Sequence, residues 1–303
     1  MGKVAFLFSG QGSQYPGMGK ELFDRSAAAR RVFEMADRIR AGTSIQCFTA
    51  SKEELSVTIN TQPCLFCADL AAAEALSESD VIPDVIAGFS LGEIPALAFG
   101  GYLTYEDAFR FVCRRAEYMD TAARKNKGAM VAVLKLSEDR VEEIAGMVGD
   151  CYPANYNSGS QTVVACAEEK ADILIQTVKQ YGGRGVKLAV SGAFHSPYMS
   201  EAGIRLRQDF GSLRLKEPKI PVYSNVTAQI YTGEDLLFEQ VSSPVLWKKT
   251  IEDMSARGVD IFIEVGAGKT LCSLVSAIIP DALALNVEDE GSLAKTLEVI
   301  KNR

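Results

Sequence analysis

Short apolar runs alternate with longer amphipathic stretches along most of the chain. The apolar runs are bounded by Gly or Pro and read VAFLF at 4–8, VIAGFS near 85, PVYSN near 221 and DIFIEVGAG near 260. Strands separated by helices in this way are typical of an α/β fold whose sheet is mainly parallel. We therefore predict a large α/β domain built on such a sheet.

The segment between residues 127 and 192 has a different pattern. Its predicted strands lie at 128–134, 152–156, 161–166 and 186–190. Two helices with apolar residues at i, i+3, i+4 and i+7 separate them, at 141–148 and 171–178. The order β-α-β-β-α-β is that of a ferredoxin-like domain. We predict that 127–192 form such a small domain, inserted after a polar hinge at 124–127, and that 1–126 and 193–303 form the large domain.

Composition narrows the classes of function. The 303 residues are 47% hydrophobic and 23% charged, which suits a globular protein with a substantial core. The net charge of −7 argues against binding to nucleic acid or to an anionic membrane surface. The apolar run Val4 to Phe8 is too short for a signal peptide or a membrane span. We therefore expect a cytoplasmic protein whose seven cysteines are free thiols.

Two local motifs resemble functional sites, but neither is expected to have a functional role. Cys64 and Cys67 have metal-site spacing, but the chain has one histidine and no second such pair. We expect two buried cysteines in a helix that has Pro63 at its start, and no metal site. The sequence Asn225-Val226-Thr227 matches a glycosylation acceptor, which has no use in a chain that is not secreted.

The spacing Gly88-Phe89-Ser90-Leu91-Gly92 is the pattern of a nucleophile elbow. Such an elbow places a serine on a tight strand-to-helix turn of an α/β-hydrolase-like domain. A serine nucleophile needs a base, and His195 is the only histidine available. It lies in the loop motif SGAFHSPYM, where the inserted domain returns to the large one. The alternative is a histidine with a structural hydrogen bond only.

An oxyanion hole needs backbone N–H groups aimed at the developing charge. The amide of Leu91 follows the serine directly, and the glycine-rich loop at 9–14 could supply a second donor. That loop does not match a dinucleotide fingerprint, because Tyr15 stands where the third glycine is required. The loop at 266–270 likewise lacks the first glycine of a phosphate-binding loop, since position 263 is Ile263.

One arginine falls on the apolar stripe of the helix predicted at 105–120. The stripe contains Ala108, Phe111, Val112 and Met119, and Arg115 lies among them. A guanidinium removed from water needs an anionic partner. Spacing leaves two alternatives open, an internal Asp or Glu or the carboxylate of a substrate.

Taken together, the motifs resemble those of the malonyl-CoA:acyl-carrier-protein transacylase family. The matching segments cover essentially the whole chain in order: FLFSGQGSQYPGMGKEL, TQP, GFSLGE, RRAEYM, ANYNSGSQ, GAFHSPYM, EQVSSPVLW and EVGAGKTL. The resemblance implies a ping-pong transfer of malonyl from coenzyme A to the phosphopantetheine thiol of acyl carrier protein. The implied destination is fatty-acid or polyketide synthesis.

The resemblance also implies roles for individual residues. Ser90 would be the nucleophile and His195 the base, while the main-chain carbonyl of Gln240 would orient the histidine. The amides of Gln11 and Leu91 would form the oxyanion hole. Arg115 would bind the malonyl carboxylate, and the form GAFH is associated with malonyl rather than methylmalonyl.

Two residues depart from the family pattern. Phe89 stands where the family usually has histidine, so the wall of the acyl pocket is expected to differ. Pro95 stands in the helix after the elbow, so an irregular start is expected for that helix.

Partners and competing functions follow from the same resemblance. The expected partners are malonyl-CoA and acyl carrier protein. We expect a monomer that uses no cofactor, since the coenzyme A thioester is the substrate. An acyl hydrolase would have no need of Arg115, and a catalytically inactive docking module would not need the set of Ser90, His195 and Arg115. For the acidic carrier protein we predict a basic surface at Arg124, Lys125 and Lys127, with Lys248 and Lys249 as second choice.

Overall fold

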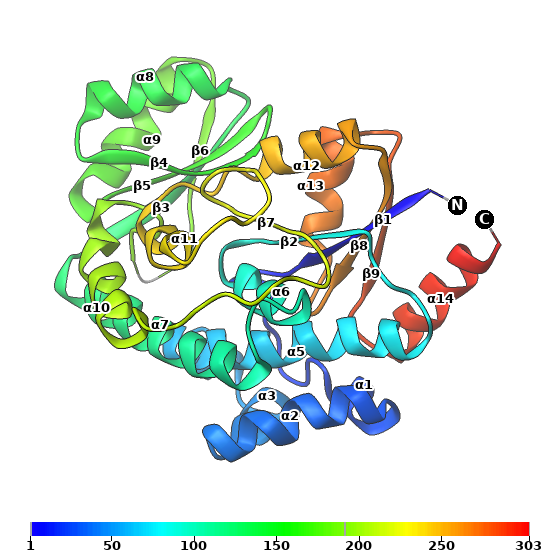
Figure 1. The fold of residues 1–303 in the computed structure, drawn as a ribbon. Helices are drawn as coiled ribbons and strands as arrows, with labels where there is room; N and C mark the ends of the chain where they lie inside the picture. Colours follow the sequence, from blue (N-terminus) through cyan, green and yellow to red (C-terminus); the bar gives the residue numbers. More distant parts are fainter. Residues whose placement is uncertain (1, 191, 303) are drawn as a thin grey trace.

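The computed structural model describes residues 2–190 and 192–302, and its centre is a five-stranded parallel sheet (Figure 1). The strands have the order β7-β2-β1-β8-β9. Their bounds are β1 Lys3–Phe8, β2 Val85–Gly88, β7 Val222–Tyr223, β8 Val259–Val265 and β9 Leu283–Val287. All neighbouring pairs in this sheet are parallel, which confirms the predicted sheet.

Both faces of the parallel sheet are covered by helices, which explains why β1 is apolar at consecutive positions. Phe6 and Phe8 belong to one core, with side chains of α2, α5, α6 and α7. Ala5 and Leu7 point the other way, into a second core with side chains of α12 and α13. The strand therefore shows no alternation of polar and apolar residues in the sequence.

The helices of the described residues follow the chain in this order: α1 Lys20–Arg25, α2 Ala27–Ile39, α3 Thr43–Thr49, α4 Lys52–Leu55, α5 Thr58–Glu78, α6 Glu93–Phe99, α7 Tyr105–Lys125, α8 Glu138–Val148, α9 Ala171–Gln180, α10 Ser200–Phe210, α11 Asp235–Glu239, α12 Trp247–Ala256, α13 Thr270–Ile278 and α14 Glu290–Lys301. Short 3₁₀ turns lie at Ser90–Gly92, Glu168–Lys170, Pro197–Met199 and Gln240–Ser242. Within the described part of the chain, none of the helices is both long and apolar enough to cross a membrane.

A second, antiparallel sheet has the order β4-β5-β3-β6. Its strands are β3 Gly128–Leu134, β4 Cys151–Ser158, β5 Gln161–Ala167 and β6 Arg184–Lys187. With α8 and α9 they follow the predicted β-α-β-β-α-β order, and the two helices cover one face of the sheet. Residues of the opposite face, such as Met130 and Val163, join the core of the large domain. The exact domain boundaries at 127 and 192 stay a prediction.

Four details differ from the sequence-based expectation. The last strand of the small sheet is Arg184–Lys187 rather than 186–190, because these four residues pair with β3. Pro63 is not at the start of its helix but is the sixth residue of α5, inside it. The expected hinge at 124–127 is partly helical, since α7 continues to Lys125. Strand β9 was not predicted, and four of its five residues are only half-buried.

Candidate active site

Ser90 lies directly beyond the carboxyl end of β2, on a turn that only glycines permit. A Cβ on Gly88 would be 2.0 Å from the backbone of Gly92, and one on Gly92 would be 2.3 Å from the carbonyl oxygen of Phe8. Ser90 itself has φ of +55°, a left-handed conformation that costs a non-glycine residue about 1–3 kcal/mol. The Gly-x-Ser-x-Gly spacing is therefore the spacing of a real, strained elbow. A 3₁₀ turn begins at Ser90 and leads into α6, which agrees with the expected irregular helix start.

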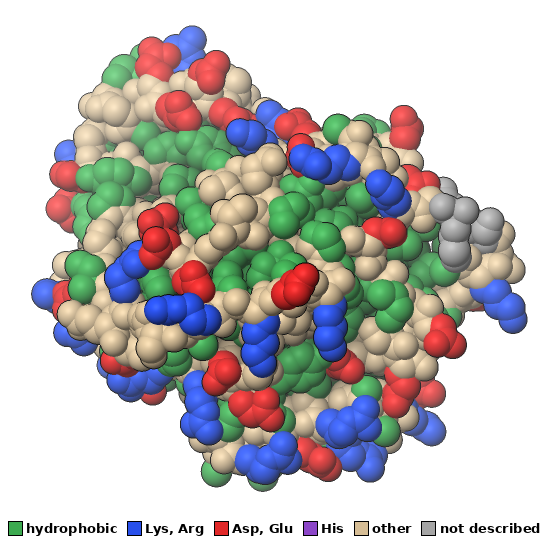
Figure 2. All heavy atoms as spheres, viewed as in Figure 1, with side chains coloured by type: hydrophobic (Ala, Val, Ile, Leu, Met, Phe, Trp, Pro, Cys, Tyr) green, Lys and Arg blue, Asp and Glu red, His purple; other side chains and the backbone are tan. Residues whose placement is uncertain are grey.

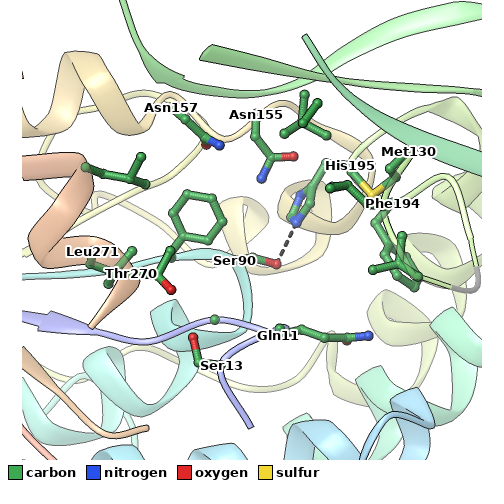
Figure 3. Close-up of a pocket in the computed structure, with 18 of the residues that line it drawn as sticks. Gln11, Ser13, Ser90, Met130, Asn155, Asn157, Phe194, His195, Thr270 and Leu271 are labelled. Atoms are coloured by element: carbon green, nitrogen blue, oxygen red, sulfur yellow. Dashed lines mark hydrogen bonds between the residues drawn. The ribbon is translucent and has the colours of Figure 1, made fainter. Parts of the chain in front are cut away.

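His195 lies next to Ser90 in the pocket, and the dashed line in Figure 3 marks the hydrogen bond between them. Its Nε2 is 2.6 Å from the Ser90 hydroxyl, and its Nδ1 is 3.0 Å from the main-chain oxygen of Gln240 and 3.2 Å from that of Ser243. Carbonyl oxygens can only accept, so the proton belongs on Nδ1 and the Nε2 lone pair is directed at Ser90. The pair is thus arranged as nucleophile and base. Backbone carbonyls take the place that an acidic side chain has in a Ser-His-Asp triad. Residue 191, the first of SGAFHSPYM, lies outside the described residues.

Burial keeps His195 in its neutral form. The side chain is 3% exposed, and burial lowers its pKa to about 4, with the positive charge of Arg115 as the second cause. The two carbonyl contacts act in the opposite direction and only partly offset this effect. At neutral pH the imidazole is therefore ready to accept a proton from Ser90.

Arg115 is buried beside the serine without an acidic partner in contact. It is 1% exposed, and its guanidinium donates to the side-chain oxygens of Gln62 at 2.8 Å and Gln240 at 2.9 Å. A third contact, to the Ser90 hydroxyl, is 3.4 Å long. None of the ion pairs found among the described residues involves Arg115, and its Nε has no hydrogen-bond partner there.

Burial also lowers the pKa of Arg115, to about 10, and the nearby Glu93 opposes that shift. The guanidinium still carries its charge at neutral pH, held only by neutral amides. Of the two alternatives left open by the sequence, an internal ion-pair partner is therefore not what the structure shows. A buried cation of this kind is suited to an anion that enters from outside.

These groups open into one pocket of about 280 Å³ between the two sheets. Loops from the carboxyl edge of the parallel sheet form its floor, which is where ligands bind in open α/β sheets. Asn155 and Asn157 on β4 and Gln161 on β5 contribute amides from the small domain, and Thr270 and Leu271 of α13 close one side (Figure 3). Most of the remaining lining is apolar and includes Met119, Met130 and Phe194. The polar groups are therefore few.

Of the remaining predicted site residues, Gln11 and Phe89 line this pocket, and Leu91 is buried next to Ser90. Gln11 is part of its wall, and its side-chain amide donates to Thr58 at 3.2 Å. Leu91 has a fully buried side chain in the first turn after Ser90. Phe89 lines the pocket and packs edge-on against Trp247, with 5.2 Å between the ring centres.

Known proteins match this chain over nearly its whole length. Residues 5–292 match the model of the acyl transferase domain family. The malonyl CoA-acyl carrier protein transacylase of Bacillus subtilis (strain 168) is 35% identical over 311 aligned residues, covering 99% of this chain and 98% of that protein.

This chain belongs to the malonyl CoA-acyl carrier protein transacylase family.

Solved structures of the family superpose closely on the fold. The Clostridium perfringens malonyl CoA-acyl carrier protein transacylase has a TM-score of 0.95 at 35% identity, covering 99% of this chain and 98% of that one. A malonyl-transacylase solved in complex with a type II polyketide-synthase acyl-carrier protein, PlMCAT:AntF, has a TM-score of 0.93 at 30% identity, covering 98% and 99%. The predicted family, the fold class and the assignment as an acyltransferase are confirmed.

The structure also locates residues that sequence reasoning missed or treated differently. Gln62 was quoted only as part of TQP, and it proves to hold Arg115.

Cys64 and Cys67 are free and fully buried, as expected. Among the described residues, no group of three or more His, Cys, Asp or Glu could hold a metal ion.

The basic residues suggested for carrier binding are largely paired on the surface. Arg124 is 2.8 Å from Asp120, Lys125 is 2.6 Å from Glu201, and Lys248 is 3.0 Å from Glu138. Charges of both signs are interspersed over the face shown in Figure 2, with hydrophobic and uncharged surface near its centre. Exposed pairs are weak, so these side chains can exchange partners at low cost. Their role in binding stays a prediction.

Proposed function

We propose that this enzyme transfers malonyl from malonyl-CoA to the phosphopantetheine thiol of acyl carrier protein through a malonyl-Ser90 ester. The observation that carries the proposal is the buried Arg115, 3.4 Å from the Ser90 hydroxyl and held by neutral amides only. A malonyl group has a carboxylate one carbon beyond the carbonyl that the serine attacks. An arginine so near the nucleophile is suited to bind that carboxylate by two parallel hydrogen bonds.

The first half-reaction begins with proton transfer from the Ser90 hydroxyl to Nε2 of His195, 2.6 Å away. The serine oxygen attacks the thioester carbonyl, and the negative charge develops on the carbonyl oxygen. The amides of Gln11 and Leu91 are the proposed donors to that oxygen. When the carbon–sulfur bond breaks, coenzyme A leaves as a thiolate and takes the proton from His195.

The second half-reaction runs the same steps with the other thiol. The pantetheine thiol of the carrier gives its proton to His195 and attacks the malonyl-Ser90 ester. Ser90 leaves, recovers the proton, and the malonyl thioester departs on the carrier. The main-chain oxygen of Gln240 keeps the imidazole in the required tautomer throughout, and the proposed scheme uses no cofactor.

The names of the relatives support this choice of substrate. The Bacillus subtilis protein is named for malonyl CoA and acyl carrier protein, and PlMCAT was solved with a carrier of polyketide synthesis. We propose a monomer that uses a carrier of either fatty-acid or polyketide synthesis.

The test is intact-protein mass spectrometry after brief exposure to malonyl-CoA or acetyl-CoA. Wild type is compared with Ser90→Ala, Arg115→Ala and the control Arg114→Ala, whose arginine is on the exposed face of the same helix. We expect a malonyl mass gain in wild type and in Arg114→Ala. The gain should vanish in Ser90→Ala and weaken in Arg115→Ala, and acetyl-CoA should give none in wild type.

Other outcomes would contradict particular parts of the proposal. Equal labelling of wild type by both thioesters would show that Arg115 does not select malonyl. Labelling that persists in Ser90→Ala would exclude Ser90 as nucleophile. Rapid release of free malonate in the presence of carrier protein, without transfer to it, would indicate a hydrolase.

A further inference from the structure

Asn225, which the sequence suggested only as part of an unused glycosylation pattern, lies directly behind the nucleophile elbow. It follows β7 just as Ser90 follows β2, and these two strands are parallel neighbours. The two turns therefore meet at the carboxyl edge of the sheet, although 135 residues separate them. The Asn225 side chain is buried, with 2% of the residue exposed.

The amide of Asn225 holds both ends of the elbow segment. Its Oδ1 accepts from the backbone N–H of Ser90 at 2.8 Å, and its Nδ2 donates to the carbonyl oxygen of Gly88 at 2.6 Å. The side chain thus pairs with this short segment as a neighbouring strand would. The backbone N–H of Asn225 in turn donates to a side-chain oxygen of buried Glu93 at 2.5 Å.

This bracing matters because Ser90 is in a left-handed conformation, at φ +55°. A strained residue keeps such a conformation only when its surroundings fix it. Without Asn225 the Ser90 N–H would lose its partner, and a backbone donor without a partner inside the protein is unfavourable. Relaxation of the turn would relieve that cost and would move the hydroxyl away from His195.

Gln240 connects the same brace to the other working groups. Its Nε2 donates to the carbonyl oxygen of Ser90 at 2.6 Å and lies 3.5 Å from Oδ1 of Asn225. Its Oε1 accepts from Arg115, and its main-chain oxygen faces His195. Ser90 is therefore held at its N–H by Asn225 and at its carbonyl oxygen by Gln240.

We propose that Asn225 is a positioning residue for acyl transfer, which fixes the strained backbone of Ser90 so that its hydroxyl stays within hydrogen-bonding distance of His195. It touches no reacting atom, and it acts through Ser90. The inference rests on the proposed role of Ser90 as nucleophile.

The test measures the reactivity of Ser90 with a neutral fluorophosphonate, which needs neither Arg115 nor a carrier. The labelling rate per folded molecule is followed by mass spectrometry for wild type and Asn225→Ala. The control is Thr296→Val, in which a buried residue elsewhere in the molecule loses its hydrogen bond of 3.0 Å to the main-chain oxygen of Asn286. We expect Asn225→Ala to react at least about tenfold more slowly, which corresponds to about 1.4 kcal/mol. Thr296→Val should lower only the unfolding temperature.

The variant Asn225→Asp adds a readout that a merely structural role would not move. A protonated carboxyl group, like the amide, both accepts and donates, whereas a carboxylate only accepts. The labelling rate of Asn225→Asp relative to wild type should therefore rise as pH falls from 8 to 5.5. The titratable and charged groups around this position are Glu93, Tyr231, Arg115 and His195, and taking the ratio to wild type removes their shared effects.

Two results would overturn the proposal: a wild-type labelling rate in folded Asn225→Ala, or an Asn225→Asp ratio that does not change with pH. If Asn225→Ala fails to fold, the Asn225→Asp ratio decides alone. Failure of the proposed function has a different signature. Wild type would then react with the fluorophosphonate at Ser90 and would gain no malonyl mass from malonyl-CoA.

Discussion

The pKa of His195 gives a direct test of the proposed base. The structure places it at about 4, because burial and the charge of Arg115 both disfavour the imidazolium. A base with that pKa is still about 90% neutral at pH 5, whereas an exposed histidine with a pKa near 6.5 would be about 3% neutral. The two cases differ roughly thirtyfold in the expected rate at pH 5.

The assay is the rate of Ser90 labelling by the neutral fluorophosphonate between pH 4 and pH 9. Circular dichroism at each pH restricts the comparison to folded protein, and Ser90→Ala gives the background. We expect the rate to stay nearly level down to pH 5 and to reach half its plateau near pH 4. A half-point near 6.5 in folded protein would refute the assignment of burial as the controlling cause.

The contribution of Arg115 can be separated by Arg115→Met, which removes the positive charge and keeps much of the volume. The pKa of His195 should rise, because the second cause of its depression is gone, and the half-point should move to higher pH. It should remain below 6.5, because the histidine stays buried. An unchanged half-point would mean that the two charges do not interact as the geometry indicates.

Three further predictions concern specificity, stability and the carrier. Arg115→Met should lower kcat/KM for malonyl-CoA by about a hundredfold or more, because two charge-assisted hydrogen bonds of about 1.5–3 kcal/mol each are lost, while Arg114→Met should not; equal losses in both would contradict this. Glu93 is buried, and burial raises its pKa to about 8, so its stabilising contribution is complete below pH 4.5 and is lost as pH rises through 8. The free energy of unfolding in urea of Glu93→Gln, minus that of wild type, should therefore increase by on the order of 4 kcal/mol between pH 5 and pH 9. A difference that does not change with pH would show that the pKa of Glu93 is not raised by burial. Charge reversal at the predicted basic surface should raise the KM for carrier protein and leave labelling by malonyl-CoA unchanged. The residues to be changed are Arg124, Lys125, Lys127, Lys248 and Lys249. An unchanged KM would show that they do not form the docking surface.

Much of the fold could be predicted because its signals are local. The order of the small domain follows from helical and strand periodicity, and the elbow follows from two glycines that sterics demand. The misplaced features have weak local signals. Helix α5 begins at Thr58 without a side-chain cap, so Pro63 was the only visible start signal. Strand β9 is largely half-buried, and its pattern is correspondingly unclear.

The sequence by itself indicated the residues that are proposed to carry the chemistry. Ser90 is marked by its glycines, His195 is the only histidine, and Arg115 is a charge on an apolar helix face. Each of these signals lies within a few residues of its own position.

The tertiary structure alone decided how those residues are held. It showed that Arg115 contacts Gln62 and Gln240 rather than an acidic side chain, and that Asn225 supports Ser90. These contacts join elements far apart in the chain. Ser90 meets Asn225 because the parallel strands β2 and β7 bring their carboxyl ends to one edge of the sheet, and Arg115 meets Gln62 because α7 packs against α5. Hydrogen bonds across that edge leave no periodic pattern in the sequence, so only the folded arrangement reveals them.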